Sequence, residues 1–183
     1  MTRIVGGTAG GRRIEVPSGE ATRPTSDRAR EGLFNTLDGL LEIARIAVLD
    51  LYAGSGALGL EALSRGASIA IFVESSRRAA AAISANLAAL GMTGEIRREP
   101  AKTALRRPPA RPVRLVLADP PYAVTAGELS AVLTQLLDGW LDDDAVLVVE
   151  RSARDPEWTW PAGIKALKSR TYGEAALWYG RRP

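Results

Sequence analysis

The segment DLYAGSGALG occupies residues 50–59, between an apolar stretch and a helix-prone stretch. Its glycines Gly54, Gly56 and Gly59 match the pattern G-x-G-x-x-G. Glycines in this pattern let a strand turn sharply into a helix, and they let backbone amides approach a ligand closely. The pattern is typical of nucleotide-binding α/β folds, and by itself it does not separate nicotinamide dinucleotides from other adenosine cofactors.

Apolar stretches alternate with helix-prone stretches on both sides of this segment. Helices are predicted at 57–65, 77–90 (ended by Gly91) and 127–138. Strands are predicted at 46–51, 69–73, 95–98, 113–118, 145–149, 164–167 and 175–179. Because the clearest strands are almost continuously apolar, they predict a mostly parallel sheet with helices on both faces. Ligands bind such sheets at the carboxyl ends of the strands.

The first 32 residues differ from the rest because they are polar, glycine-rich and basic. Short β-prone pieces at 3–5 and 13–16 predict a small hairpin. Thr25 or Ser26 can then cap a helix whose first turn contains Asp27. That helix is predicted to continue along an apolar face made by Leu33, Phe34, Leu37 and Leu41. We therefore divide the chain into an N-terminal hairpin and helix extension over 1–42 and an α/β domain over 43–183.

Two carboxylates end the first two predicted strands of the α/β domain. Asp50 stands four residues before Gly54, where it would repel a pyrophosphate but attract a ligand that carries an ammonium and a sulfonium. Glu74 ends the second strand, where a carboxylate can accept hydrogen bonds from both hydroxyls of an adenosine ribose. Glu74 supports any nucleoside cofactor, whereas Asp50 favours S-adenosylmethionine over a nicotinamide dinucleotide.

Asp119-Pro120-Pro121-Tyr122 follows the predicted strand at 113–118 and is the most specific short motif in the chain. The two prolines fix their own φ angles and make a stiff turn, which preorganises the groups beside them. The Asp119 carboxylate and the Pro120 carbonyl can each accept one N–H of an exocyclic amine, so that the nitrogen lone pair points at a methyl donor. Tyr122 can stack on a base that has been flipped out. The motif therefore predicts methylation of a base amine.

The composition limits the remaining function classes. The 183 residues fit one core, and 46% of them are hydrophobic. The absence of cysteine and histidine excludes disulfides, a cysteine nucleophile, a histidine base and the usual zinc ligands, so we expect no metal. No apolar run predicts a signal peptide or a membrane span, so we expect a cytoplasmic protein. Arginine supplies 21 of the 24 cationic side chains, which suits a nucleic-acid partner but also a genome rich in G and C.

With these motifs identified, the chain resembles the bacterial RsmD-type 16S rRNA guanine-N2 methyltransferases. Residues 22–28 (TRPTSDR), together with Arg30-Glu31 and Leu33-Phe34-Asn35, are similar to the N-terminal signature of that family. Residues 3–7 and 11–12 are similar to its opening strand, 50–66 to its cofactor loop and following helix, and 119–122 to its catalytic motif. The resemblance covers essentially the whole chain, and the N-terminal signature is its most specific part.

The resemblance implies a class I S-adenosylmethionine-dependent methyltransferase fold, with residues 43–183 as the methyltransferase domain. The implied substrate is one guanine of 16S rRNA in the 30S subunit, and we expect a monomer. The implied catalytic residues are Asp119, Pro120, Pro121 and Tyr122. The implied cofactor contacts are Asp50, Tyr52, Ala53, Gly54, Ser55, Gly56, Glu74 and Ser75, with Glu99 and Ala101 near the adenine on either side of Pro100. The candidate RNA contacts of the N-terminal extension are Arg12, Arg13, Arg23, Arg28 and Arg30.

Three other functions stay open from the residues alone. A nicotinamide-dependent oxidoreductase would use the same glycine loop, but it leaves Asp50 and the motif at 119–122 unexplained. An adenine-N6 methyltransferase acting on DNA or RNA would need the same hydrogen bonds at its amine. An RNA-binding protein that kept the fold without the chemistry would have no use for an intact Asp119 and Glu74.

Overall fold

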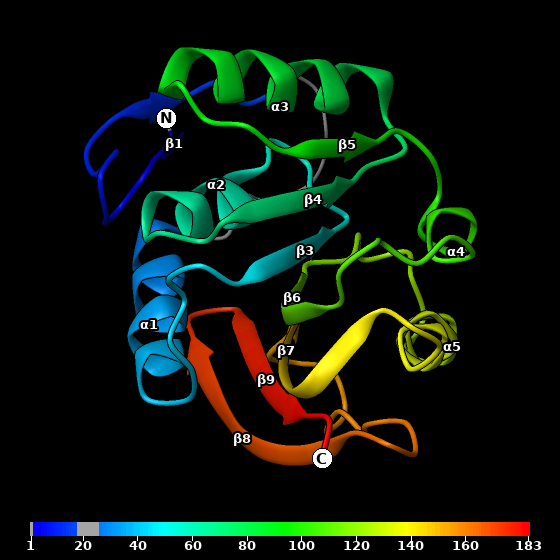
Figure 1. Cartoon of the computed structure of the whole chain (residues 1–183). Coiled ribbons are helices and arrows are strands. Elements are labelled where there is room, and N and C mark those ends of the chain that lie inside the picture. Colours follow the sequence, from blue (N-terminus) through cyan, green and yellow to red (C-terminus); the bar gives the residue numbers. More distant parts are fainter. Residues whose placement is uncertain (1, 18–25) are drawn as a thin grey trace.

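A seven-stranded sheet forms the centre of the computed structural model, which describes residues 2–17 and 26–183 (Figure 1). Its strands are β3 (Ala47–Leu51), β4 (Ile69–Val73), β5 (Glu95–Arg97), β6 (Val113–Ala118), β7 (Leu141–Ser152), β8 (Lys165–Tyr172) and β9 (Ala175–Arg181). They lie in the order β5-β4-β3-β6-β7-β9-β8. The neighbouring strands β5, β4, β3, β6 and β7 are parallel to one another, and β9 runs antiparallel to both β7 and β8. The predicted mostly parallel sheet is confirmed.

Helices cover both faces of the sheet, as the apolar strands predict. The helices α1 (Asp27–Asp38), α2 (Ala57–Ser64) and α3 (Arg77–Leu90) lie on one face, and α4 (Ala101–Ala104) and α5 (Ala126–Gln135) lie on the other (Figure 1). Alternate strand residues enter the two cores. Leu49 and Val116 pack with α4 and α5, whereas Val48 and Leu117 pack with α1 and α2. Packing on both faces explains why these strands are apolar without alternation.

The N-terminal hairpin consists of β1 (Thr2–Arg3) and β2 (Arg13–Ile14), which pair antiparallel. Ile4, Ala9 and Ile14 are buried in the same core cluster as side chains of α2, α3 and β4. Glu61 of α2 is fully buried and accepts hydrogen bonds from the backbone N–H groups of Val5 at 2.7 Å and Gly6 at 2.8 Å. The hairpin is therefore docked on the α/β layer, and the division of the chain at residue 42 stays a prediction.

Helix α1 begins as the sequence predicts and ends earlier. The Ser26 hydroxyl caps it by accepting the N–H of Ala29 at 3.1 Å. Gly39 ends it by donating its N–H to the Thr36 carbonyl at 3.3 Å, so the predicted continuation to Leu41 is wrong. Leu41 still packs against the cluster that contains Phe34. Thr25 and Arg23, for which we predict a cap and an RNA contact, lie outside the described residues.

The remaining element bounds agree with the predicted ones to different degrees. Strand β6 matches the prediction at 113–118, and α3 matches 77–90 with Gly91 at its end in the left-handed conformation, φ 67°. Strands β7 and β8 are longer than the predicted 145–149 and 164–167, and α5 ends three residues before the predicted 138. Within the described residues, no helix has both the length and the apolar character needed to span a bilayer.

Candidate active site

The predicted motifs meet at one edge of the sheet, where the parallel strands end. Leu51 of β3 is paired with Val73 of β4 on one side and with Ala118 of β6 on the other. The chain segments that follow these residues contain the glycine loop, Glu74 and Asp119 respectively. Gly54 and Asp119 therefore lie at the same end of two neighbouring strands, which a shared pocket requires.

The glycine loop has the backbone conformation that its sequence predicts. Gly54 and Gly56 have φ angles of 55° and 79°, in the left-handed region that favours glycine. A Cβ atom at Gly59 would lie 2.4 Å from a ring carbon of Phe72, so the third glycine lets α2 pack closely on β4. At Gly54 a Cβ would meet no atom within 4 Å. The loop thus presents open space above Gly54, where a ligand can approach the backbone.

Glu74 connects the end of β4 to this loop. Its Oε2 accepts the N–H of Gly54 at 2.8 Å, and its Oε1 accepts the N–H of Ser76 at 2.7 Å. Each carboxylate oxygen has two lone pairs, so both oxygens retain a lone pair for a hydroxyl donor. The half-buried Glu74 therefore fixes the loop and remains able to receive a ribose.

Asp50 lies beneath the loop rather than at its surface. The residue is 1% exposed, and its Oδ2 accepts the N–H of Gly59 at 2.8 Å. Burial raises the pKa of Asp50 well above its ordinary value of 3.8, although the hydrogen bond from Gly59 opposes this, and the charges of Asp119 and Glu74 raise it further. Asp50 thus anchors the first turn of α2, and its contact with a cofactor ammonium stays a prediction.

The turn at 119–122 is held by its neighbours. Pro120 is buried, whereas Tyr122 is 71% exposed. Arg151 of β7 donates a hydrogen bond to the Val124 carbonyl at 2.9 Å and forms an ion pair with Asp155 at 3.2 Å. Thr125 and Glu128 form a capping box that starts α5 directly after the turn. The aromatic ring of Tyr122 is therefore presented to solvent on a braced segment, as a stacking surface for a base would be.

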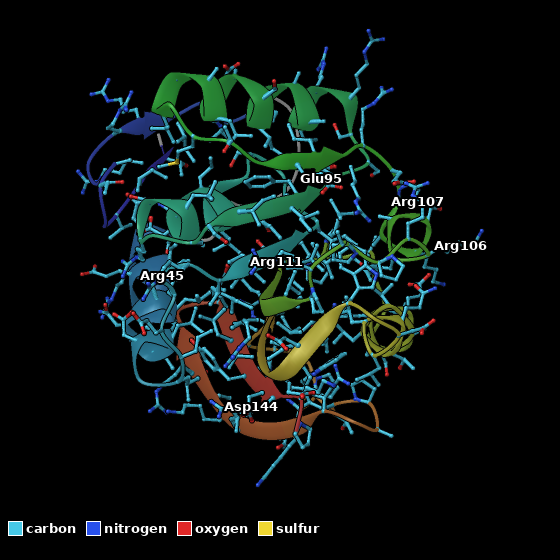
Figure 2. The ribbon with its side chains drawn as sticks, in the orientation of Figure 1. Arg45, Glu95, Arg106, Arg107, Arg111 and Asp144 are labelled. Carbon is cyan, nitrogen blue, oxygen red and sulfur yellow. The ribbon has the colours of Figure 1, made fainter. Side chains whose placement is uncertain are left out.

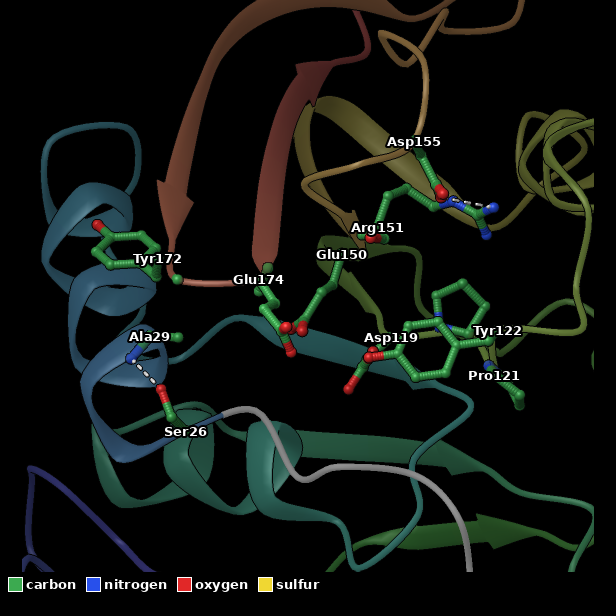
Figure 3. A pocket seen from close by; sticks show the side chains of 14 residues that line it. Ser26, Ala29, Asp119, Pro121, Tyr122, Glu150, Arg151, Asp155, Tyr172 and Glu174 are labelled. Atoms are coloured by element: carbon green, nitrogen blue, oxygen red, sulfur yellow. Dashed lines mark hydrogen bonds and ion pairs between the residues drawn. The ribbon is translucent and has the colours of Figure 1, made fainter.

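A cavity of about 490 Å³ opens beside this turn (Figure 3). Residues 119–122 line one side of the cavity, and the end of β7 and the β8–β9 turn line two further sides. Ser26 and Ala29, at the start of α1, line a fourth side. The cavity thus joins the predicted catalytic turn to the helix that carries the N-terminal signature, and its volume is in the range of small-molecule sites.

The other predicted cofactor residues surround the loop in different ways. Tyr52 is half-buried with a φ of 60°, and burial together with the charge of Glu128 raises its pKa. Ala53 is 9% exposed, Ser55 is half-buried and Ser75 is exposed. Further along the edge, Glu99 forms an ion pair with Arg107, and Ala101 is buried in the core as the first residue of α4. The roles of these residues in cofactor binding stay predictions.

The predicted RNA contacts divide into exposed and buried arginines. Arg13 and Arg28 are exposed. Arg12 is exposed too, but its guanidinium donates to the Ala89 and Leu90 carbonyls at the end of α3. Arg30 is 1% exposed and bonds to Asp27 and to the Arg3 carbonyl. The prediction of Arg30 as an RNA contact is therefore corrected, because its guanidinium fixes the hairpin to α1 and does not reach the surface.

Several residues of the site escape the sequence motifs. Asn86 of α3 is 3% exposed and exchanges two hydrogen bonds with the Glu15 backbone, at 2.7 and 2.9 Å. Its amide also donates to the Ser55 carbonyl at 3.1 Å, so it ties the hairpin exit to the glycine loop. Glu150 and Arg151 line the cavity from β7. Glu150 is not among the predicted site residues, although it directly follows the predicted strand at 145–149 as Glu74 follows the one at 69–73. No local pattern marks Asn86.

Comparisons with known proteins agree with this arrangement. The family model described as "Conserved hypothetical protein 95" matches residues 2–181. The chain is 38% identical over 176 residues to ribosomal RNA small subunit methyltransferase D of Escherichia coli (strain K12), which spans 95% of this chain and 86% of the relative. The solved structure of Escherichia coli yhhF has 37% identity and a TM-score of 0.85, with 99% of this chain and 97% of that chain covered.

A more distant structure extends the likeness of fold. SMU.776, which was solved in complex with SAH, has a TM-score of 0.67 at 14% identity over 87% of this chain and 50% of its own. The strand order and these neighbours identify the predicted class I, Rossmann-like methyltransferase fold. The resemblance seen in the N-terminal signature, the glycine loop and the motif at 119–122 is confirmed. The chain belongs to the conserved hypothetical protein 95 family and is a relative of the RsmD-type small subunit methyltransferases.

Proposed function

We propose that this protein transfers a methyl group from S-adenosylmethionine to a base of ribosomal RNA, and specifically to the N2 amine of a guanine in 16S rRNA. The main observation in support of the proposal is that β3 and β6 are paired and end side by side. The glycine loop follows β3, and the turn at 119–122 follows β6. The family membership and the name of the Escherichia coli relative support rRNA as the substrate. We further propose that the substrate is presented within the 30S subunit and that the protein acts as a monomer.

The residues at this edge fit S-adenosylmethionine. The open space above Gly54 admits the ligand to the loop backbone, and the Glu74 carboxylate can accept the ribose hydroxyls. Asp50 lies buried beneath the loop, and a cationic ligand nearby would favour its ionised form. When bound, S-adenosylmethionine supplies an electrophilic methyl group on a sulfonium. A pyrophosphate would instead disfavour the ionised form of Asp50, so this residue does not support the nicotinamide alternative.

The cavity residues would prepare the acceptor amine. The Asp119 carboxylate and the Pro120 carbonyl each accept one N–H of the amine, so that its lone pair is directed toward the glycine loop. Tyr122 offers its exposed ring to the face of the flipped base. No strong base is needed before attack, because the amine nitrogen becomes acidic only once it carries the methyl group. These roles suit a chain without histidine.

RNA binding would use exposed arginines of the N-terminal extension. Arg28 stands in the first turn of α1, next to the residues Ser26 and Ala29 that line the cavity. Arg13 lies on the docked hairpin. Guanidinium groups at these positions can contact phosphates while the target base occupies the cavity.

The test is methyl transfer followed by nucleoside analysis. The protein is incubated with isotopically labelled S-adenosylmethionine and 30S particles from a strain that lacks the related enzyme, in parallel with free 16S RNA. We expect labelled N2-methylguanosine, and we expect it to form more efficiently on 30S particles than on free 16S RNA. Labelled N6-methyladenosine would establish the adenine alternative instead. Thermal stabilisation by NADH but not by S-adenosylhomocysteine would overturn the choice of cofactor.

A further inference from the structure

We propose that Glu150 selects guanine by accepting the N1–H of the base whose N2 amine is bound at Asp119; this inference rests on the proposed function. The register between β6 and β7 supports this proposal. Ala118 of β6 is paired with Val149 of β7, and Asp119 and Glu150 are the next residues along these two parallel strands. The two carboxylates therefore project from neighbouring positions at the edge where the acceptor base would enter.

Side-chain alternation directs both groups to the same side of the sheet. Ala118 and Val149 belong to the core beneath α4 and α5, so the residues after them face the opposite side, toward α1. The cavity lies on that side, where Ser26 and Ala29 of α1 help to line it. Figure 3 shows the side chains of Asp119 and Glu150 at this cavity.

Guanine and adenine differ in the ring nitrogen beside the exocyclic amine, and this difference determines which base the Glu150 carboxylate favours. In guanine, the atom beside the N2 amine is N1, which carries a hydrogen. In adenine, the ring nitrogen beside the N6 amine has a lone pair and no hydrogen. An ionised carboxylate next to Asp119 can accept a hydrogen bond from the guanine N1–H, but it repels the lone pair of adenine. A site that must hydrogen-bond its substrate discriminates strongly against an analogue without the donor.

Asp155 and Glu174 are the other carboxylates that line this cavity. Asp155 forms an ion pair with Arg151 at 3.2 Å, and the position of Glu174 suits the role less well than that of Glu150. Glu174 belongs to the β8–β9 turn, is exposed, and forms an ion pair with Arg154 at 3.2 Å. Glu150 is half-buried within β7 and is the strand neighbour of Asp119. Glu174 therefore provides a matched control that removes the same charge from the same cavity.

The test compares guanine with 2-aminopurine, which keeps the exocyclic 2-amine but has a lone pair at N1. The modified guanine is first mapped by mass spectrometry and is then replaced by 2-aminopurine in a ligated 16S RNA. We expect the unmodified protein to transfer methyl groups to guanine at least about 100-fold faster than to 2-aminopurine. In Glu150→Gln, whose amide can donate to N1, this preference should narrow by about tenfold or more. Binding of S-adenosylhomocysteine by the variant, measured by calorimetry, verifies its fold.

Each outcome decides the assignment. An unchanged preference in Glu150→Gln, or an equal narrowing in Glu174→Gln, would overturn the role of Glu150 while leaving the proposed function intact. A failure of the unmodified protein to form N2-methylguanosine would instead refute the proposed function, and this inference with it.

Discussion

Asp119 is the residue to which the proposed chemistry assigns the acceptor amine. Asp119→Ala should lower single-turnover methyl transfer by about 10²–10³-fold, the typical cost of losing one preorganised polar contact. The affinity for S-adenosylhomocysteine should stay the same, because the Gly54 and Glu74 contacts are intact. Asp143→Ala, near the opposite end of the parallel strands, serves as the control. An equal fall in cofactor affinity would make Asp119 a cofactor-binding residue.

Asp50 links stability to pH because its pKa is raised by burial. The folded state favours the protonated form, so this contribution to stability is complete below the ordinary pKa of 3.8 and is lost as the pH rises through the higher folded-state value. Asp50→Asn keeps an oxygen for the Gly59 N–H and cannot ionise. Urea unfolding should therefore show the variant gaining stability relative to the parent as the pH rises from 4 to 8. A parallel pH dependence in the two proteins would contradict this account.

Asn86 of α3 connects this helix to the hairpin and to the glycine loop through three hydrogen bonds. Asn86→Ala should lower the free energy of unfolding by about 1–3 kcal/mol, the range for losing the partner of buried polar groups. It should also weaken S-adenosylhomocysteine binding, because the Ser55 carbonyl loses its donor. Ser84→Ala on the exposed side of the same helix is the control. Undiminished ligand affinity in Asn86→Ala would show that this contact does not hold the loop.

Elements with a strong local signal could be predicted from the sequence. Strand β6 is buried on both faces and therefore reads as an apolar run, and Gly91 ends α3 where a left-handed residue is needed. Strand β8 is largely exposed at the sheet edge, so most of its length has no apolar signal. Helix α4 is only one turn long, and its start at Pro100 resembles a loop. In β7 the acidic run Asp142–Asp144 conceals the first residues of the strand.

The same distinction holds for the candidate site. The rule that ligands bind at the ends of parallel strands brings Gly54, Glu74 and Asp119 together correctly. It does not reveal that Arg30 is buried, because no sequence pattern distinguishes a buried arginine from the exposed arginines of the same basic segment. The contact between Asn86 and Glu15 joins residues 71 positions apart. Such contacts depend on how the hairpin docks on α3, and no local pattern encodes that docking.

The distribution of arginines over the whole molecule predicts which substitutions affect RNA binding. Arg28 is exposed in the first turn of α1 and lines a hollow with Arg3 and Gly11 of the hairpin, whereas Arg111, labelled in Figure 2, lies on the connection that leads into β6. Arg28→Ala should weaken binding to 16S RNA and reduce the slope of log K against log salt by about 1, the effect of one lost phosphate contact. Cofactor affinity should not change. Equal RNA affinity and salt dependence in Arg28→Ala and Arg111→Ala would remove Arg28 from the RNA-binding surface.

The proposed methyl transfer requires that a cofactor on the glycine loop after β3 reaches the cavity beside the turn after β6, and the two segments follow paired ends of these strands. A crystal structure with S-adenosylhomocysteine bound tests this geometry most directly. We predict that the ribose hydroxyls lie on Glu74, with the sulfur above Gly54 and facing the cavity at Asp119 and Tyr122. A ligand bound elsewhere, or a sulfur directed away from that cavity, would contradict the proposed methyl transfer.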